Sequence, residues 1–169
     1  ALDRGDAMRG AIVFFQPQMA CNKCHRVDDS AAAALAPNLA LLDRNVSNAA
    51  LVESVLYPSK SIRTGFESTT FLLTDGTVLS GFVVASDADT VKVRDATNPE
   101  RIHDIERHDI EEQKVNPLSL MPEGQVNFLA DEAAFFDLIR YLIEIRDGGP
   151  QRAKQLQPSA NQLALVLPD

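Results

Sequence analysis

Two cysteines and a histidine stand together near the start of the chain, and they constrain its fold more than any other feature. The segment reads Cys21-Asn22-Lys23-Cys24-His25 and holds both cysteines of the 169-residue sequence. This is the C-x-x-C-H spacing of a covalent c-type haem site. Two thiols three positions apart can add to the two vinyl groups of a haem, and the adjacent histidine then becomes an axial ligand of the iron. The segment predicts one haem c per chain.

Two other uses of a cysteine pair fit the sequence less well. A thioredoxin-like redox motif belongs in a βαβ context, whereas the segment before Cys21 has the spacing of a helix. A structural zinc site takes four protein ligands, and the sequence offers no second cysteine pair. Covalent haem attachment is therefore the favoured interpretation of the motif.

Composition narrows the class of protein. Hydrophobic residues make up 45% and charged residues 24%, as in an ordinary folded domain of this length. The formal net charge of −8 argues against nucleic-acid binding, which needs cations to neutralise phosphates. No apolar run approaches the roughly 18 residues of a membrane span. We predict no nucleic-acid partner and no membrane span in this chain.

Apolar residues at helical spacing predict three helices. The first covers residues 3–15, with Asp3 as its N-cap, and the second covers about 47–56, with Ser47 or Asn48 as the cap. The third runs over about 131–147 and is closed by a Gly-Gly-Pro sequence. Residues 148–169 then read as a tail or linker.

Between the second and third helices the apolar period changes from helical to alternating. Four segments have this pattern, with an Asp75-Gly76 hairpin turn after the first: 66–73, 78–85, 90–94 and 101–105. They predict an antiparallel meander, curled into a small sheet or barrel.

A haem bound on one side by His25 takes Met or His on the other. The candidates are Met8, Met19, Met121, His103 and His108. Met19 is too close to Cys21 to reach the opposite haem face, and Met8 lies on an apolar helix stripe. His103 reads as a solvent-facing residue of a predicted strand, and His108 follows in a charged stretch that faces water. Met121 lies in a loop that Pro122 restricts. A bis-histidine carrier and an iron with an open position remain alternatives.

The joint pattern resembles class I cytochromes c, and more narrowly the haem-binding cytochrome domain common in large proteins of planctomycetes and verrucomicrobia. It covers about residues 5–147. The stretches that carry it are Cys21-Asn22-Lys23-Cys24-His25, Glu53-Ser54-Val55-Leu56-Tyr57-Pro58-Ser59, Leu73-Thr74-Asp75-Gly76 and Ser119-Leu120-Met121-Pro122-Glu123-Gly124.

The resemblance implies a mainly α cytochrome c fold with an inserted antiparallel β subdomain, α+β overall. The cytochrome domain would span residues 1–147, with the β-meander inserted at about 64–113. The resemblance further implies that Gly10 lets the terminal helices cross near Tyr141.

For the haem site, the resemblance implies that Cys21 and Cys24 form the thioether bonds and that His25 is the proximal ligand. It implies Met121 as the distal ligand and a backbone carbonyl of Pro37 facing the His25 ring. The sequence departs from the family at 31–34, where four alanines stand in place of the usual glycines.

The expected function is one-electron transfer by a low-spin haem c, with no substrate chemistry in this chain. A partner redox protein or a fused dehydrogenase-like domain would exchange electrons with it, and the acidic charge suits a basic docking surface. The alternative is a haem-based sensor or peroxidase-like enzyme with an open or labile distal position. Haem c attachment places the protein in the bacterial periplasm or otherwise outside the cytoplasmic membrane, with any leader cleaved or upstream.

Overall fold

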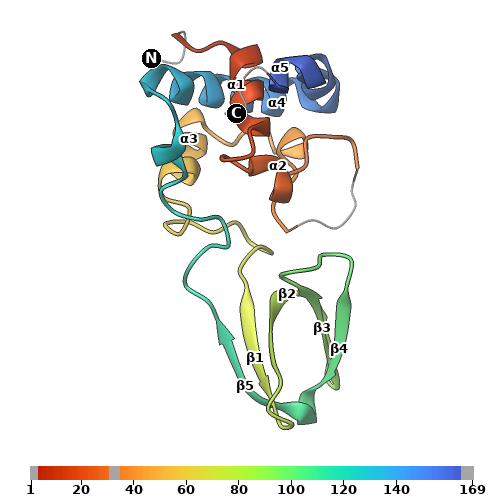
Figure 1. The fold of residues 1–169 in the computed structure, drawn as a ribbon. Helices are drawn as coiled ribbons and strands as arrows, with labels where there is room; N and C mark the ends of the chain where they lie inside the picture. The colour runs from red at the N-terminus through yellow and green to blue at the C-terminus, as the bar shows by residue number, and fades with distance from the viewer. Residues whose placement is uncertain (1–3, 31–34, 165–169) are drawn as a thin grey trace. The chain divides into compact units, whose positions relative to one another are not determined.

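The computed structural model describes residues 4–30 and 35–164, and they form an α+β fold (Figure 1). Five α-helices and a five-stranded antiparallel sheet are present among these residues. The prediction of a mainly α cytochrome c fold is therefore wrong. The strands form a complete five-stranded sheet with a hydrophobic core of its own, so the fold is α+β and not mainly α.

The chain divides into two compact units. The first unit is Ala1–Tyr57 with Glu123–Asp169, and the second unit is Pro58–Pro122. The α-helices of the described residues all belong to the first unit: α1 (Ala7–Phe15), α2 (Cys21–Cys24), α3 (Asn48–Leu56), α4 (Glu132–Gln155) and α5 (Ala160–Ala164). Side-chain caps begin the longer helices, because Asp6, Ser47 and Asp131 each accept a hydrogen bond from a backbone N–H in the first turn. The expected cap Asp3 lies outside the described residues.

The core of the first unit forms where α1 crosses α4. Gly10 makes this crossing close, since a Cβ there would collide with the backbone carbonyl of Asp137 and lie 2.8 Å from the Cβ of Tyr141. Phe14 and Tyr141 pack at 5.4 Å between ring centroids beside it. The close crossing that the resemblance implies is thus present.

A buried carboxylate joins the same two helices. Asp137 on α4 accepts hydrogen bonds from the backbone N–H of Asp6 at 2.6 Å and from Arg9 Nε and Nη2 at 2.7 and 2.9 Å. Burial opposes the charge of Asp137, but these hydrogen bonds outweigh it and lower the pKa of the carboxyl group. The hydrogen bonds of Asp137 with Asp6 and Arg9 hold the start of α1 on α4.

Helix α4 continues past the predicted end at 147. It bends at Gly149, whose φ of 65° is open mainly to glycine, and Pro150 begins the second part. Ala153 and Leu156 in this part are buried in the core of the first unit. Their burial explains why the chain stays helical where the sequence predicts a tail.

The second unit is a sheet of consecutive antiparallel strands: β1 (Thr69–Leu73), β2 (Val78–Ser86), β3 (Thr90–Asp95), β4 (Ile102–Glu106) and β5 (Ile110–Val115). The strand order is β4-β3-β2-β1-β5, so the 3-10 turn η3 (Arg107–Asp109) carries the chain from one edge to the other. Four side chains form the core of this unit: Phe71, Val91, Val93 and Ile105. The predicted hairpin at Asp75-Gly76 is confirmed by the pairing of β1 with β2.

The sequence predicts four strands, and β5 is the one it misses. Only Ile110 of this strand is partly buried, and the rest of it is exposed. Because both faces of β5 are polar, the strand has no alternation to reveal it. Backbone pairing with β1, in register from Thr69 opposite Val115, holds it in the sheet.

Candidate haem-attachment site

A tight turn delivers the chain from α1 into the C-x-x-C-H segment. The backbone N–H groups of Met19 and Ala20 both donate to the carbonyl of Gln16, at 3.1 and 3.0 Å. Ala20 has a left-handed backbone (φ 51°, ψ 17°), which a residue with a Cβ adopts at a cost. Helix α2 begins directly after it, so this turn sets the direction in which the two thiols are presented.

The two thiols share one face of α2, because residues three apart on a helix are neighbours. Both are free, with Cys21 half-buried and Cys24 exposed. Burial raises the pKa of the Cys21 thiol to about 11. A thioredoxin-like redox cysteine needs a lowered pKa, so this site does not favour that alternative.

His25 is held at the end of α2 by two hydrogen bonds. Its backbone N–H donates to the carbonyl of Cys21 at 2.9 Å. Its ring Nδ1 lies 2.9 Å from the carbonyl oxygen of Pro37. A carbonyl can only accept, so Nδ1 carries the proton and Nε2 keeps a free lone pair. Burial lowers the pKa of His25, although the bond to Pro37 opposes this, and the neutral ring is the form that binds a metal.

The loop that carries Pro37 is fixed by its neighbours. Asn38 donates from Nδ2 to the carbonyls of Asp28 and Ser30, at 2.9 and 3.1 Å. Its Oδ1 accepts from the backbone N–H of Ala40 at 3.1 Å. Asn38 has no role among the residues predicted from the sequence, although an Asn after Pro is a turn signal that could have indicated it. The alanine run at 31–34 lies outside the described residues.

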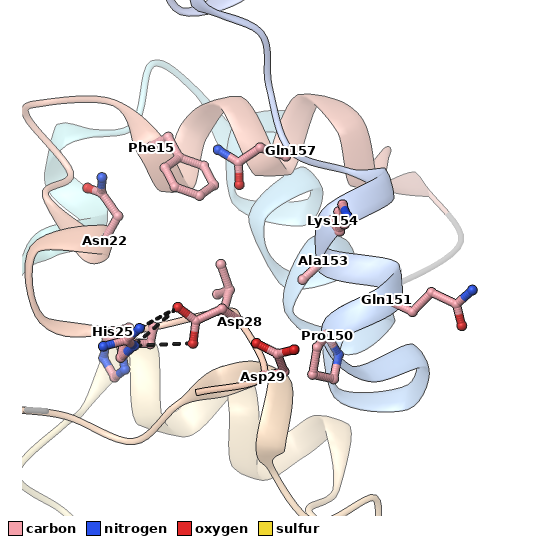
Figure 2. A pocket seen from close by; sticks show the side chains of 12 residues that line it. Phe15, Asn22, His25, Asp28, Asp29, Pro150, Gln151, Ala153, Lys154 and Gln157 are labelled. Carbon is pink, nitrogen blue, oxygen red and sulfur yellow. Dashed lines mark hydrogen bonds and ion pairs between the residues drawn. The ribbon is translucent and has the colours of Figure 1, made fainter. Parts of the chain in front are cut away.

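A pocket of about 770 Å³ opens beside His25 (Figure 2). Figure 2 shows Asn22 and His25 on one side of it and Gln151 and Lys154, from the second part of α4, on the other. The dashed lines mark the hydrogen bonds from Arg26 to Asp28, the shortest of them 2.6 Å. Neither Cys21 nor Cys24 lines this pocket. The pocket therefore adjoins Asn22 and His25 and not the two thiols.

A bare metal ion, unlike a haem, needs several donor side chains close together. Within residues 4–30 and 35–164, no three His, Cys, Asp or Glu side chains lie together as a metal cluster would require. A haem brings four nitrogen donors of its own and needs only axial ligands from the protein. One histidine with a fixed tautomer and two free thiols on one helical face therefore fit a haem and not a structural zinc ion.

The candidates for the second axial ligand are divided between the two units. Met8 packs against the core of the first unit, as its interpretation as a core residue predicts, and Met19 is buried in that core. His103 is half-buried, with Nε2 3.0 Å from Asp95 Oδ2, so its expected solvent-facing position is wrong. His108 is exposed. These two histidines belong to the second unit.

Met121 lies in the loop after β5, in the second unit, where its backbone N–H donates to Ser119 Oγ at 3.1 Å. Ser119 itself donates from its backbone N–H to Ser59 Oγ at 3.2 Å. Past this loop, the chain returns to the first unit, where Gln125 Nε2 donates to the carbonyl of Met19 at 3.2 Å. The position of Met121 as an iron ligand stays a prediction.

Within the described residues, none of the helices combines the length and the apolar character needed to cross a bilayer. Comparison of the chain with protein-family models and with curated proteins gives no match.

Proposed function

We propose that this chain is a one-electron carrier that holds a single haem c through thioether bonds to Cys21 and Cys24, with His25 as the proximal ligand. The observation that carries the proposal is the contact between His25 Nδ1 and the Pro37 carbonyl, beside two free thiols on one helical face. Bound haem iron supplies a reversible one-electron couple.

The chain's own residues account for attachment and ligation. Each thiol adds across one vinyl group, where the sulfur bonds to one carbon and the thiol hydrogen passes to the other, so no oxidant is consumed. The Pro37 carbonyl fixes the His25 tautomer and ring orientation and makes Nε2 a stronger donor. Asn38 holds this carbonyl in place through the loop it clamps.

Met121 is the distal ligand in this proposal. Its loop is bounded on one side by the hydrogen bonds among Ser59, Ser119 and Met121. On the other side Gln125, only four residues later, is bound to the carbonyl of Met19, two residues before Cys21. A neutral thioether favours ferrous over ferric iron, so this ligation gives a comparatively high reduction potential.

The partner and the location follow from charge and chemistry. A net charge of −8 favours a redox partner, or a fused dehydrogenase-like domain, with a basic docking surface. Thiol addition requires reduced cysteines and delivered haem, which places maturation of the protein in the periplasm or elsewhere outside the cytoplasmic membrane.

The test is a spectroelectrochemical titration of the purified, haem-loaded chain and three variants. Wild type should titrate reversibly with one electron and show a weak near-infrared band of sulfur-to-iron ligation. Met121→His should stay low-spin at a lower potential, and Met121→Ala should turn high-spin and bind carbon monoxide. His108→Ala, an exposed control, should match wild type. A haem protein that binds carbon monoxide without any substitution and shows no near-infrared band would contradict the electron-carrier proposal.

A further inference from the structure

A glutamine joins the segment after Met121 to the segment that leads into the C-x-x-C-H motif. Gln125 lies four residues after Met121 and begins the 3-10 turn η4 (Gln125–Phe128). Its side chain is half-buried, and Nε2 donates to the backbone carbonyl of Met19 at 3.2 Å. Met19 lies two residues before Cys21, in the same unit as Gln125. The contact therefore ties the chain that follows the proposed distal ligand to the chain that precedes the first thiol.

The Met19 carbonyl is a fixed point of the first unit. The Met19 side chain is 1% exposed and belongs to the core of that unit. Its backbone N–H donates to the carbonyl of Gln16 at 3.1 Å, and the left-handed Ala20 follows it. Because Met19 is held by both its side chain and its backbone, a donor bound to its carbonyl is held in place as well. The hydrogen bond thus fixes the start of η4 against the turn that leads into α2.

Chain length makes this anchor important for Met121. Four residues of chain span at most about 14 Å, so anchoring Gln125 limits how far Met121 can move from it. Pro122 lies within this short span, and its ring fixes one backbone torsion. The entropic cost of ordering a loop falls as the number of free residues falls. The hydrogen bond of Gln125 therefore lowers the cost of holding the Met121 sulfur in one place.

Haem attachment changes which donors the Met19 carbonyl has. In the free chain the Cys21 thiol also donates to it, with 3.6 Å between the sulfur and the oxygen. The thiol hydrogen is lost when Cys21 forms a thioether, and a thioether sulfur cannot donate. Within the described residues, Gln125 Nε2 is then the donor that remains for this carbonyl. The contact thus matters most in the haem-loaded chain, where Met121 has an iron to bind.

We propose that Gln125 is a positioning residue for the distal ligand: its hydrogen bond to the Met19 carbonyl orders the loop in which Met121 binds the iron. This inference rests on the proposed haem attachment and on ligation by Met121. A bond that served only the fold would be equally strong with Met121 on or off the iron, and it would leave the competition for the iron unchanged. A bond that orders the loop favours Met121 over any competing ligand.

An imidazole titration of the ferric, haem-loaded protein tests this role, with loss of the near-infrared band as the signal that Met121 has left the iron. Gln125→Met keeps the length of the side chain but removes its donor, and it should raise the affinity for imidazole about threefold to tenfold, the equivalent of one hydrogen bond. Gln125→Glu keeps the size and polarity but also lacks the donor, so it should show at least the same rise. Gln113→Met is the matched control, because Gln113 is exposed on β5, and it should bind imidazole as wild type does. Wild-type affinity in either Gln125 variant would overturn the inference.

NMR of the side-chain amide of Gln125 gives a second readout that leaves Gln125 unchanged. Coupling between two sites is reciprocal, so binding of Met121 to the iron should strengthen the Gln125 hydrogen bond by the same factor. The amide protons of Gln125 should exchange about threefold to tenfold more slowly in the ferrous wild type than in ferrous Met121→Ala with carbon monoxide bound. Equal exchange in the two proteins would contradict the role of Gln125.

The outcomes separate this inference from the function on which it rests. A wild type that shows the near-infrared band, with imidazole affinities that do not respond to Gln125, refutes only the positioning role. A wild type that lacks the band and binds imidazole as tightly as Met121→Ala refutes ligation by Met121 and the inference with it. A wild type without covalent haem refutes the haem proposal itself.

Discussion

The two units of this chain reach stability by different routes. In the sheet, each of the first three strands pairs with the next along the chain, and β5 returns to pair with β1. In the first unit, the central crossing joins α1 to α4, and the hydrogen bond from the Asp6 N–H to Asp137 connects residues 131 positions apart. The sheet therefore folds mainly from local contacts, whereas the motif-bearing unit depends on contacts that close a long loop.

The units also differ in where their chemistry lies. The sheet has regular strands and turns in which Asp carboxylates accept backbone N–H groups, as Asp75 and Asp87 do. The first unit holds the left-handed Ala20, the free thiols and the ring contact of His25 with Pro37. Regular structure thus marks the strands of the sheet, and irregular backbone marks the motif, while Met121 lies in the loop after β5. If so, damage to one unit should leave the other intact.

Phe71→Ala should produce the largest effect and confine it to the sheet. Phe71 is fully buried in the small core of the second unit, and a large-to-small change of this kind costs about 3–5 kcal/mol. The strands should unfold in denaturant before the helices, while haem staining persists. The measurement is circular dichroism with a haem stain on the same samples. Loss of haem staining would show that the haem site depends on the folded sheet.

Gly10→Ala should destabilise the helices of the first unit and leave the sheet intact. Its new Cβ meets the backbone carbonyl of Asp137, which cannot move aside as a side chain could, so the cost should be about 3 kcal/mol. The helices should then unfold first, at lower denaturant than in wild type. Gly76→Ala is the matched control, because it strains a positive φ of 84° in open space and should destabilise only the hairpin, by about 1 kcal/mol.

Asp137→Asn should destabilise the first unit by about 2 kcal/mol, since it removes hydrogen bonds to a buried charged group. The pKa of Asp137 is lower in the folded chain than in the unfolded chain. Its contribution is therefore complete above the unfolded pKa of about 4 and is lost as the pH falls through the folded pKa. Denaturant titrations from pH 7 to pH 3 should show a shallower loss of helix stability in the variant than in wild type. Parallel pH profiles would contradict this role.

Ala20→Gly should have the smallest effect, a stabilisation of the first unit by about 0.5–1 kcal/mol. Glycine adopts the left-handed backbone of this turn without the Cβ penalty, although it loses more freedom on folding. Thermal unfolding of the two proteins at the same haem content is the measurement. A lower melting temperature in the variant would mean that the Ala20 methyl group contributes packing that outweighs the backbone strain.

Sequence patterns predicted the elements whose signals are local. The cap Ser47 and the Asp75-Gly76 hairpin are confirmed. The first helix begins at Ala7 rather than at the predicted residue 3, because Asp6 is the acceptor that caps it.

The features that the sequence did not reveal depend on distant residues. Strand β5 is polar on both faces and exists because β1 offers it a free edge. Helix α4 continues past Gly149 because Ala153 and Leu156 find a place in the core. The fold class was wrong because the predicted meander, completed by β5, is a full sheet with a core of its own. Within the described residues the Tyr141 hydroxyl has no partner, which could not be read from the residue type, because a buried Tyr usually finds one.

The most direct test of the central claim is the intact mass of the purified protein after acid–acetone extraction. The protein is expressed with a haem c maturation system. Wild type and Lys23→Ala should keep a mass increase equal to one haem, and the organic phase should stay colourless. The double variant Cys21→Ala, Cys24→Ala should show no such increase. If the haem of the wild type passes into the organic phase and the protein keeps only its polypeptide mass, the claim that Cys21 and Cys24 attach a haem is contradicted.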